Sequence, residues 1–225
     1  MEGSMPWFEN DFVAFFLELK ANNNKEWFHE NKKRYEKMVK EPFHDFVAEM
    51  IGRIQKDDPS VAIQPKEAIF RINRDIRFAK DKTPYKTNVS AVISPGGRKD
   101  FSTPGIYFEF SPNGVQVYGG AHHVEKDQLL KVRTAIMKDP AEFNKVVKAI
   151  SFITNFGELL GQKNKRLPKE FMDAAEKLPI LFNKTFYYGA TLDLDVLLSE
   201  NLADQIYELY LAGKPFNSYF KKVTQ

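Results

Sequence analysis

Residues 70–88 read FRINRDIRFAKDKTPYKTN. In the first half of this stretch apolar residues fall at every second position, the period of a half-buried β-strand. These residues are Phe70, Ile72, Ile76 and Phe78, and the opposite face carries Arg71, Asn73, Asp75 and Arg77. Arg74 interrupts the apolar face, where a charged side chain needs a carboxylate or a ligand as its partner. The stretch therefore predicts a strand that carries a polar site.

The segments that follow predict an antiparallel sheet. A compact turn at 81–85 leads to a second alternating segment at 88–94. Strands at 105–110 and 115–118 flank a Ser-Pro-Asn-Gly turn and predict a hairpin. Glu109 points away from the apolar face of this hairpin. If that side continues the polar face of the Arg-rich strand, Glu109 is a candidate counter-ion for one of the arginines.

Helical patterns stand on both sides of these strands. Helical spacing of apolar residues predicts helices at 10–21, 25–40, 41–55, 125–137, 139–150, 169–177 and 199–212. Asn23 and Glu26 predict a capping box for the second helix, and weak alternation at 184–194 predicts one more strand. Because helices and strands are segregated, we expect an α+β fold with a mainly antiparallel sheet, built as a single domain over residues 5–225. Met1–Ser4 are expected to be a tag or a disordered tail.

The composition excludes several classes of protein. The chain has 225 residues and no cysteine, which removes disulfides, thiolate catalysis and cysteine-based metal sites. No apolar run reaches the roughly 18 residues of a membrane span, and the first residues lack the pattern of a secretory signal. We therefore expect a cytoplasmic protein that does not enter a membrane.

Positive charge is concentrated around the Arg-rich strand. The net charge of the whole chain is only +3, yet the segment from Lys66 to Lys86 contains seven basic residues and three acidic ones. The rest of the chain is therefore slightly acidic. Any attraction for an anion is expected in this segment.

Several motifs together resemble one protein family. They are the run 70–87, the opening Pro-Trp-Phe at 6–8, the segment NNNKEWF at 22–28 and the segment GIYFE at 105–109. This combination is similar to a widespread, mostly bacterial family called domain of unknown function 2461, and the similarity covers nearly the whole chain from Pro6. The resemblance implies a single-domain fold without an established activity, so it transfers no catalytic mechanism.

The residue types on the Arg-rich strand favour binding of a small anionic ligand, with phosphorylated compounds as one example. Arg71 and Arg77 share one face of a regular strand, and guanidinium groups bind phosphate or carboxylate oxygens through two hydrogen bonds. The predicted ligand-binding residues are Arg71, Arg74, Asp75, Arg77, Lys80, Lys82, Tyr85, Lys86 and Glu109. An equally weighted alternative is a structural network in which Arg74 pairs with Glu109, and Asp75 with Arg77 or with turn amides.

Nucleic-acid binding is a second alternative. Basic residues interleaved with Phe70, Phe78 and Tyr85 are typical of a stacking platform beside phosphate contacts. Against this hypothesis, Phe70 and Phe78 lie on the predicted apolar face, where they are explained as core residues. The nearly neutral total charge also lacks the broad basic surface of dedicated binders. A protein-interaction module that uses the loop at 95–100 is a further alternative without specific support.

The remaining candidate groups have ordinary explanations. His122, His123 and Glu125 form a fragment of a metal site, but adjacent histidines on a strand point to opposite faces, so loop histidines are favoured. Asp193 and Asp195 have acid–base spacing for a strand, although helix-start and surface roles are favoured. The sequence contains no Walker phosphate loop, dinucleotide glycine fingerprint, nucleophile elbow or histidine–glutamate zinc motif. We therefore assign no metal, cofactor, reaction or oligomeric state.

Overall fold

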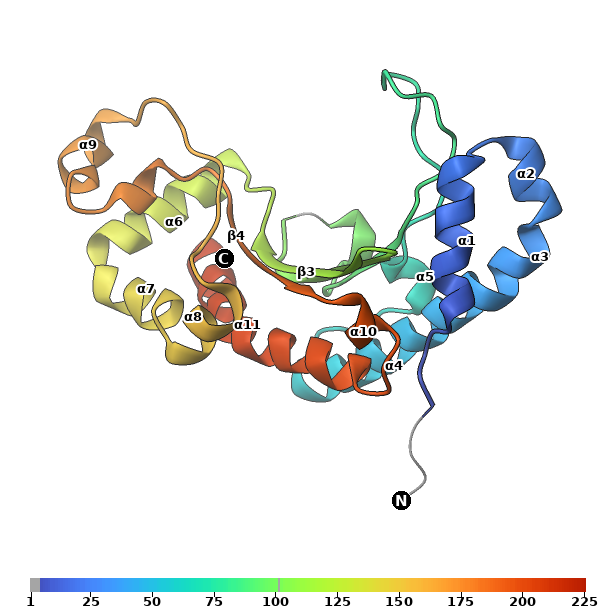
Figure 1. Ribbon diagram of the computed structural model, residues 1–225. Helices are drawn as coiled ribbons and strands as arrows, with labels where there is room; N and C mark the ends of the chain where they lie inside the picture. Colours follow the sequence, from blue (N-terminus) through green and yellow to red (C-terminus); the bar gives the residue numbers. More distant parts are fainter. Residues whose placement is uncertain (1–4, 101) are drawn as a thin grey trace. The chain divides into compact units, whose positions relative to one another are not determined.

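The computed structural model describes residues 5–100 and 102–225 (Figure 1). Met1–Ser4, the expected tag or tail, lie outside the described residues. One antiparallel sheet has the strand order β1-β2-β3-β4, with β1 (Val89–Ile93), β2 (Gly105–Ser111), β3 (Gly114–Ala121) and β4 (Phe186–Leu192). Helices from the N-terminal and C-terminal parts of the chain accompany the sheet, so the fold is α+β, as the segregated sequence pattern predicted.

The helices lie before β1, between β3 and β4, and after β4. Those before β1 are α1 (Asn10–Ala21), α2 (Lys25–Glu30), α3 (Lys32–Tyr35), the π-helix η1 (Glu36–Lys40), α4 (Glu41–Asp57) and α5 (Pro65–Ala68). A short 3₁₀ helix, η2 (Gly97–Lys99), follows β1. The later ones are α6 (Lys126–Lys138), α7 (Pro140–Val147), α8 (Ile150–Phe156), α9 (Lys169–Ala175), the 3₁₀ helix η3 (Pro179–Phe182), α10 (Leu194–Leu197) and α11 (Leu202–Thr224).

The chain forms two compact units. Unit 1 consists of Met1–Arg98, Tyr107–Val117 and Thr191–Tyr207, and unit 2 consists of Lys99–Ile106, Tyr118–Ala190 and Glu208–Gln225. The expectation of a single domain over 5–225 stays a prediction. Within residues 5–100 and 102–225, no helix combines the length and the apolar character that crossing a bilayer requires.

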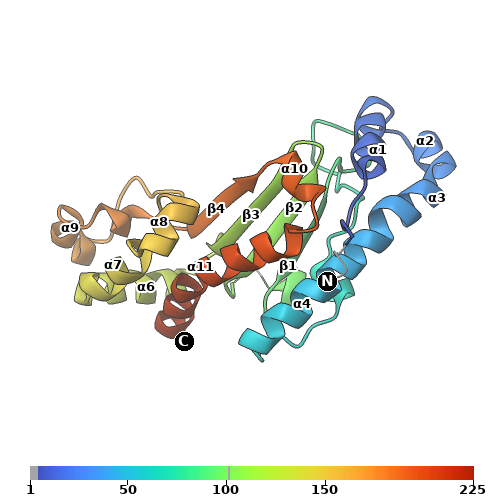
Figure 2. The ribbon, with the colours of Figure 1, turned by 60° about the horizontal axis from the view of Figure 1, so that its bottom comes forward.

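Phenylalanine rings from α4 and β2 form the centre of unit 1. Phe46 lies on the buried stripe of α4, which the helical spacing of apolar residues predicted correctly, and Phe108 and Phe110 lie on the buried face of β2. The centroid of the Phe46 ring is 5.6 Å from that of Phe108 and 5.1 Å from that of Phe110, in edge-to-face geometry. Figure 2 shows α4 beside β1. Burial of these rings fixes the helix on the hairpin.

Unit 2 is packed around Tyr188 of β4. The side chain is 3% exposed and its ring contacts three further aromatic rings, those of Phe152, Phe156 and Phe216. A Cβ atom at Gly119 would lie 2.2 Å from the Tyr188 hydroxyl oxygen, and one at Gly213 would lie 2.0 Å from it. Only residues without a side chain therefore leave room for this tyrosine between β3 and α11.

A buried guanidinium joins α6 to the η3 turn in unit 2. Arg133 is 4% exposed and donates hydrogen bonds from Nε to the Leu181 carbonyl at 2.8 Å and from Nη2 to the Asn183 carbonyl at 3.1 Å. Among the side chains described, no carboxylate lies within ion-pair distance of Arg133. Burial lowers its pKa, and the two carbonyl dipoles compensate the buried charge.

The N-terminal helices differ from the sequence predictions at two places. The predicted helix at 25–40 is interrupted at Asn31 and ends in the π-helix η1. The predicted capping box at Asn23 is wrong, because Asn24 is the N-cap of α2 and its side chain accepts a hydrogen bond from the Trp27 amide at 2.9 Å. The Asn23 side chain makes other contacts, which are described below.

The C-terminal part contains more regular structure than predicted. Helices α8 and α10 occupy segments in which no separate helix was predicted, and α11 continues past its predicted end at residue 212 to Thr224. Pro215 lies inside α11, and Phe216 and Phe220 in the added turns are fully buried. The free energy gained by burying these two rings outweighs the loss of the backbone hydrogen bond that proline cannot make. Similarly, β3 continues through Gly119 and Gly120, where the hairpin was predicted to end.

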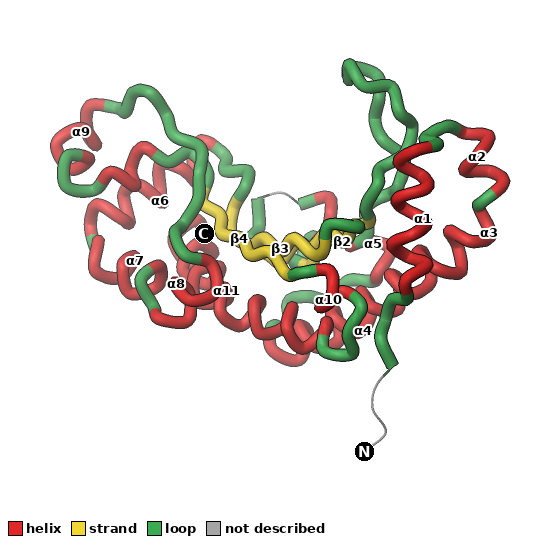
Figure 3. Tube along the Cα trace, viewed as in Figure 1, coloured by secondary structure: helices red, strands yellow, loops and turns green. Residues whose placement is uncertain are grey.

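The predicted strand at 70–78 is wrong as a regular strand. Figure 3 draws this segment as loop. Its backbone forms isolated antiparallel bridges, Ile69 with Ala91 and Asn73 with Tyr85. In contrast, the predicted strands at 88–94, 105–110, 115–118 and 184–194 correspond to β1, β2, β3 and β4.

Substitution of two helical glycines tests the packing of Tyr188. We expect Gly213→Ala to lower the free energy of unfolding by about 1–3 kcal/mol, because the new methyl group overlaps a ring that Gly119 and three aromatic side chains prevent from moving. The matched control is Gly52→Ala in α4, where a Cβ atom meets nothing within 4 Å. This control should raise the free energy of unfolding by roughly 0.5–1 kcal/mol. Urea denaturation measures both values, and equal stability of the two variants would contradict the packing argument.

Candidate functional site

Residues 69–88, here called the Arg-rich arm, form an irregular extension of unit 1 beside α1 (Figure 1). Three backbone hydrogen bonds hold its two sides together: Phe70 N–H to the Ser90 carbonyl at 2.9 Å, Arg74 N–H to the Pro84 carbonyl at 2.9 Å, and Lys86 N–H to the Ile72 carbonyl at 2.8 Å. The hydrogen bond between Arg74 and Pro84 closes the arm tip, residues 74–84. The residues nearer β1 form the arm base.

Tyr85 fixes the arm to the N-terminal helices. The Asn23 side chain donates a hydrogen bond to the Tyr85 carbonyl at 2.9 Å and accepts one from the Tyr85 amide at 3.1 Å. The Tyr85 ring stacks on the Phe28 ring of α2 with a centroid distance of 4.0 Å and an interplanar angle of 17°. Tyr85 was predicted as a ligand-binding residue, but its ring is buried, so it acts here as an anchor.

A second anchor holds the start of the arm. Arg98, which lies within η2, donates from Nη1 to the Lys66 and Ile69 carbonyls, both at 2.5 Å. Gly97 has a φ of +58°, and a Cβ atom there would lie 2.6 Å from the Glu67 carbonyl oxygen. The loop at 95–100 therefore packs closely on the entry to the arm.

Asp75 and Asp81 explain why the arm tip is not a strand. The Asp75 carboxylate accepts a hydrogen bond from the backbone N–H of Arg77 at 3.2 Å, and the Asp81 carboxylate accepts one from that of Thr83 at 2.9 Å. Each contact links an aspartate to the amide two residues later, which is a turn geometry. Because these amides are bonded locally, they are not available to a strand ladder.

The same two aspartates pair with arginines of the tip. Arg77 donates from Nε to Asp75 Oδ1 at 3.0 Å and from Nη2 to Asp75 Oδ2 at 2.6 Å. Arg74 donates from Nη1 to the Asp81 carboxylate and to the Thr83 hydroxyl. The predicted pair of Asp75 with Arg77 is present. The predicted pair of Arg74 with Glu109 is wrong, because the turn brings Asp81 to Arg74.

These contacts lower the pKa values of both aspartates. The pKa of Asp75 falls to about 2, chiefly because of the side-chain hydrogen bonds from Arg77 and then the Arg77 backbone N–H. The pKa of Asp81 also falls to about 2, through the Thr83 backbone N–H and then the Arg74 side chain. Both carboxylates therefore stay ionised and paired at neutral pH.

The arm base carries two cations, Arg71 and Lys86, that form no ion pair among the described residues. Lys86 is half-buried, and its Nζ lies 5.4 Å from the centroid of the Phe70 ring. Across from the arm, the Tyr107 hydroxyl donates a hydrogen bond to Glu109 Oε2 at 2.8 Å. Arg71 is exposed and forms no hydrogen bond or ion pair with any residue in the described part of the chain.

Three effects act on the pKa of Lys86 at the arm base. Burial lowers the pKa of Lys86, the negative charge of Glu109 raises it, and the positive charge of Arg71 lowers it. Lys86 therefore lies in the field of one negative charge and one further positive charge. Tyr107, which was not among the predicted site residues, joins these residues through its hydrogen bond to Glu109.

The remaining predicted site residues lie on the tip. Lys82 Nζ donates a hydrogen bond to the Ile76 carbonyl at 2.9 Å, and Lys80 is exposed. Phe78 was predicted to be a core residue, but it is 96% exposed. This prediction was wrong because the Asp75 turn ends the strand alternation before residue 78. Phe70 is half-buried and contacts the Tyr107 ring at 6.1 Å.

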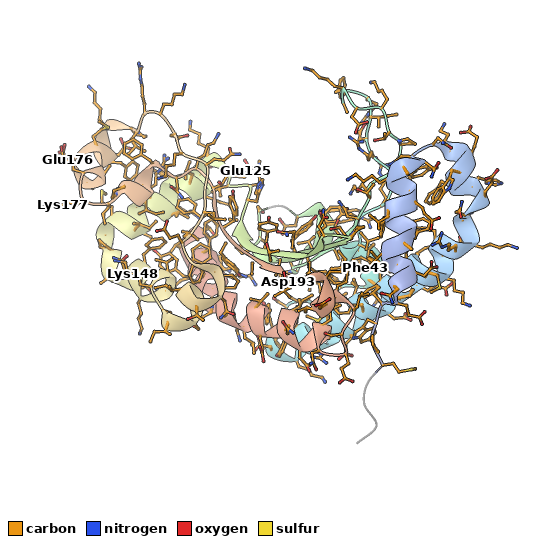
Figure 4. All side chains as sticks on the ribbon, in the orientation of Figure 1. Phe43, Glu125, Lys148, Glu176, Lys177 and Asp193 are labelled. Carbon is orange, nitrogen blue, oxygen red and sulfur yellow. The ribbon has the colours of Figure 1, made fainter. Side chains whose placement is uncertain are left out.

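The other candidate groups do not form a site. His123 Nε2 lies 2.9 Å from Glu125 Oε1, next to the start of α6, where Figure 4 labels Glu125. No cluster of three metal-ligating side chains occurs among the residues that the structure describes. Asp193 is the N-cap of α10 and Asp195 lies within that helix, so the two do not share a strand face.

Three positioning residues were absent from the predicted site. Asn23 acts on Tyr85 across 62 positions, and Arg98 acts on Ile69 across 29. Neither contact has a local sequence signal. Asp81 did have one, because an aspartate two residues before Thr83 in a turn is typical of this side-chain-to-backbone contact.

The fold and the arm define an α+β protein with a charged arm beside a four-stranded antiparallel sheet. A family model described as a conserved hypothetical protein, DUF2461, matches residues 11–219. The chain therefore belongs to the DUF2461 family, which confirms the resemblance seen in its motifs. Comparison with curated proteins and with solved structures gives no match.

Titration of the arm-tip carboxylates tests the Asp75–Arg77 pair. We expect carbon-13 NMR to give a midpoint of about 2 for Asp75. In Arg77→Ala this midpoint should rise toward the ordinary value of about 3.9, because the two side-chain hydrogen bonds are lost. Asp81 serves as the internal control and should not change, since its donors are Thr83 and Arg74.

The sign of the pH effect follows from the lowered pKa. A carboxylate whose folded-state pKa is below its unfolded-state pKa stabilises the fold at higher pH. The Asp75 contribution is therefore complete above the unfolded-state pKa of about 3.9 and is lost as the pH falls through about 2. A wild-type midpoint at the ordinary value would contradict the pair.

Proposed function

We propose that this protein binds a small anionic ligand at the arm base, through Arg71 and Lys86, with Glu109 and Tyr107 beside them. Phosphorylated compounds are the ligand class that the donor set favours. Arginine offers a planar pair of N–H donors to phosphate oxygens, and lysine adds a compact positive charge.

The observation that carries the proposal is the excess of positive charge at the arm base. Lys86 is half-buried while Arg71 repels it, and Glu109 is the carboxylate that attracts it. Two cations held near one another beside a single carboxylate are stabilised by an added anion. The exposed Arg71 side chain has no competing partner among the described residues, so it is available to that anion.

The structural-network hypothesis accounts for the tip better than for the base. Arg74 and Arg77 are paired with Asp81 and Asp75, so we withdraw these two arginines from the ligand-binding set. The pairs stabilise the turn and occupy both guanidinium groups. The proposal therefore concerns fewer residues than the nine that the sequence predicted.

Glu109 favours a ligand that carries a hydrogen-bond donor in addition to its anionic group. It accepts a hydrogen bond from Tyr107, and a carboxylate has room for further donors. In a ligand that places a hydroxyl or amino group beside its phosphate or carboxylate, the anionic group would bind Arg71 and Lys86. The hydroxyl or amino group would donate a hydrogen bond to Glu109. Residence in the cytoplasm is part of the same proposal, supported by the lack of cysteine.

A thermal-shift titration with inorganic phosphate and pyrophosphate tests anion binding. An anion at about 100 times its Kd stabilises the folded state by about 2.7 kcal/mol, which raises Tm by about 5–10 °C in a chain of this size. We expect Arg71→Ala to remove this increase while the Tm without anion stays unchanged, because Arg71 is exposed and forms no hydrogen bond among the described residues.

The matched control is Arg166→Ala, an exposed arginine of unit 2 with the same change in charge. It should keep the full shift. The proposal is rejected if neither anion changes the Tm of the wild-type protein, or if Arg71→Ala and Arg166→Ala give the same shift. A fall in the anion-free Tm of Arg71→Ala would instead favour the structural-network hypothesis.

A further inference from the structure

Phe78 at the arm tip is the most exposed aromatic side chain among the described residues. It is 96% exposed, whereas most other phenylalanines of the chain are buried in the two units. Transferring a phenylalanine side chain from water to an apolar environment is worth roughly 1.5–3 kcal/mol. Phe78 has not gained this free energy within the chain, and an apolar or stacking contact with a partner would supply it.

The neighbours and the exposure of the Phe78 ring favour stacking of a planar group on it. The guanidinium carbon of Arg77 lies 5.9 Å from the centroid of the Phe78 ring, and Arg77 is itself held by its two hydrogen bonds to Asp75. The ring thus has a cationic neighbour that is fixed in place. Its high exposure leaves the ring surface accessible for stacking.

The charge of the tip selects an anionic partner. Lys80 is exposed and forms no hydrogen bond or ion pair within the described part of the chain. Lys82 uses one of its three N–H donors on the Ile76 carbonyl, so further donors remain. The aspartates of the tip, in contrast, are occupied by Arg74 and Arg77. Two lysines therefore stand near an exposed aromatic ring without neutralising carboxylates.

We propose that the arm tip binds single-stranded nucleic acid, with Phe78 stacking on a base and Lys80 and Lys82 contacting backbone phosphates. Base–aromatic stacking together with phosphate contacts is the general mode of single-strand recognition. A duplex keeps its bases stacked on one another, so it does not offer a free base face to Phe78. This site is separate from the arm base and does not rest on the anion-binding proposal.

An anionic membrane surface fits the tip less well. Stable attachment to a bilayer needs a large buried apolar area or several anchors, and Phe78 is the one large exposed apolar side chain among the described residues of the tip. One stacked base, in contrast, matches a single aromatic ring in area and shape.

Fluorescence anisotropy with a labelled oligothymidylate tests the proposal on the full chain. We expect saturable binding at low salt, and Phe78→Ala should weaken it by roughly 5- to 150-fold, the equivalent of one stacked base. Phe78→Trp should bind as tightly as the wild type or more tightly. Lys80→Gln should lower the slope of log affinity against log salt by about 0.7, as expected for one lost phosphate contact to a single strand.

The control variant is Ile150→Ala, which removes an 85%-exposed apolar side chain from unit 2 and should leave binding unchanged. Because Phe78 is nearly fully exposed, Phe78→Ala should retain the wild-type Tm, so weaker binding cannot come from unfolding. The proposal is overturned if the wild type does not bind the oligonucleotide, if Phe78→Ala binds as tightly as the wild type, or if a duplex of this oligothymidylate with oligoadenylate binds equally well. Phe78-dependent binding to phosphatidylserine vesicles without oligonucleotide binding would overturn it in favour of a membrane surface.

Discussion

Two hydrogen bonds between the Asn23 side chain and the Tyr85 backbone determine where the Arg-rich arm lies in unit 1. The stacking of Tyr85 on Phe28 adds an apolar contact at the same point. Lys86 follows Tyr85 directly, and Asn73 is bridged to Tyr85 across the arm. The anchor therefore positions the cation of the arm base and also the beginning of the arm tip. Both candidate sites depend on contacts that themselves carry no charge.

The arm distributes its charges in two different ways. At the tip each arginine has its own carboxylate, and these exposed pairs lose little hydration when they form. At the base, Lys86 is partly removed from water, and the charges acting on it are the Glu109 carboxylate and the Arg71 guanidinium. The two ion pairs of the turn thus neutralise Arg74 and Arg77 among the basic residues seen in the sequence. The cations of the arm without an ion pair among the described residues are then found at both its ends, Lys80 and Lys82 at the tip and Arg71 and Lys86 at the base.

The sequence predicted well those elements whose apolar faces are buried. Alternation along β2 is clear because Phe108 and Phe110 meet Phe46, and the pattern and the packing agree. The same reasoning failed at Phe78, because Asp75 and Asp81 bind backbone amides and replace a ladder with turns. The charged residues of the site could be named from composition. Their pairing could not, since it depends on that turn, and anchors such as Arg98 act across tens of positions.

The buried guanidinium of Arg133 limits where residues can be inserted into unit 2. An arginine keeps its proton at any physiological pH, so the energetic demand of its burial cannot be relieved by losing charge. The carbonyls of Leu181 and Asn183 must therefore stay where they are. Surface connections usually accept extra residues, but an insertion between these two positions would shift an acceptor away from a dehydrated cation. The short connection from η3 into β4 is accordingly a place where the length of the chain is fixed.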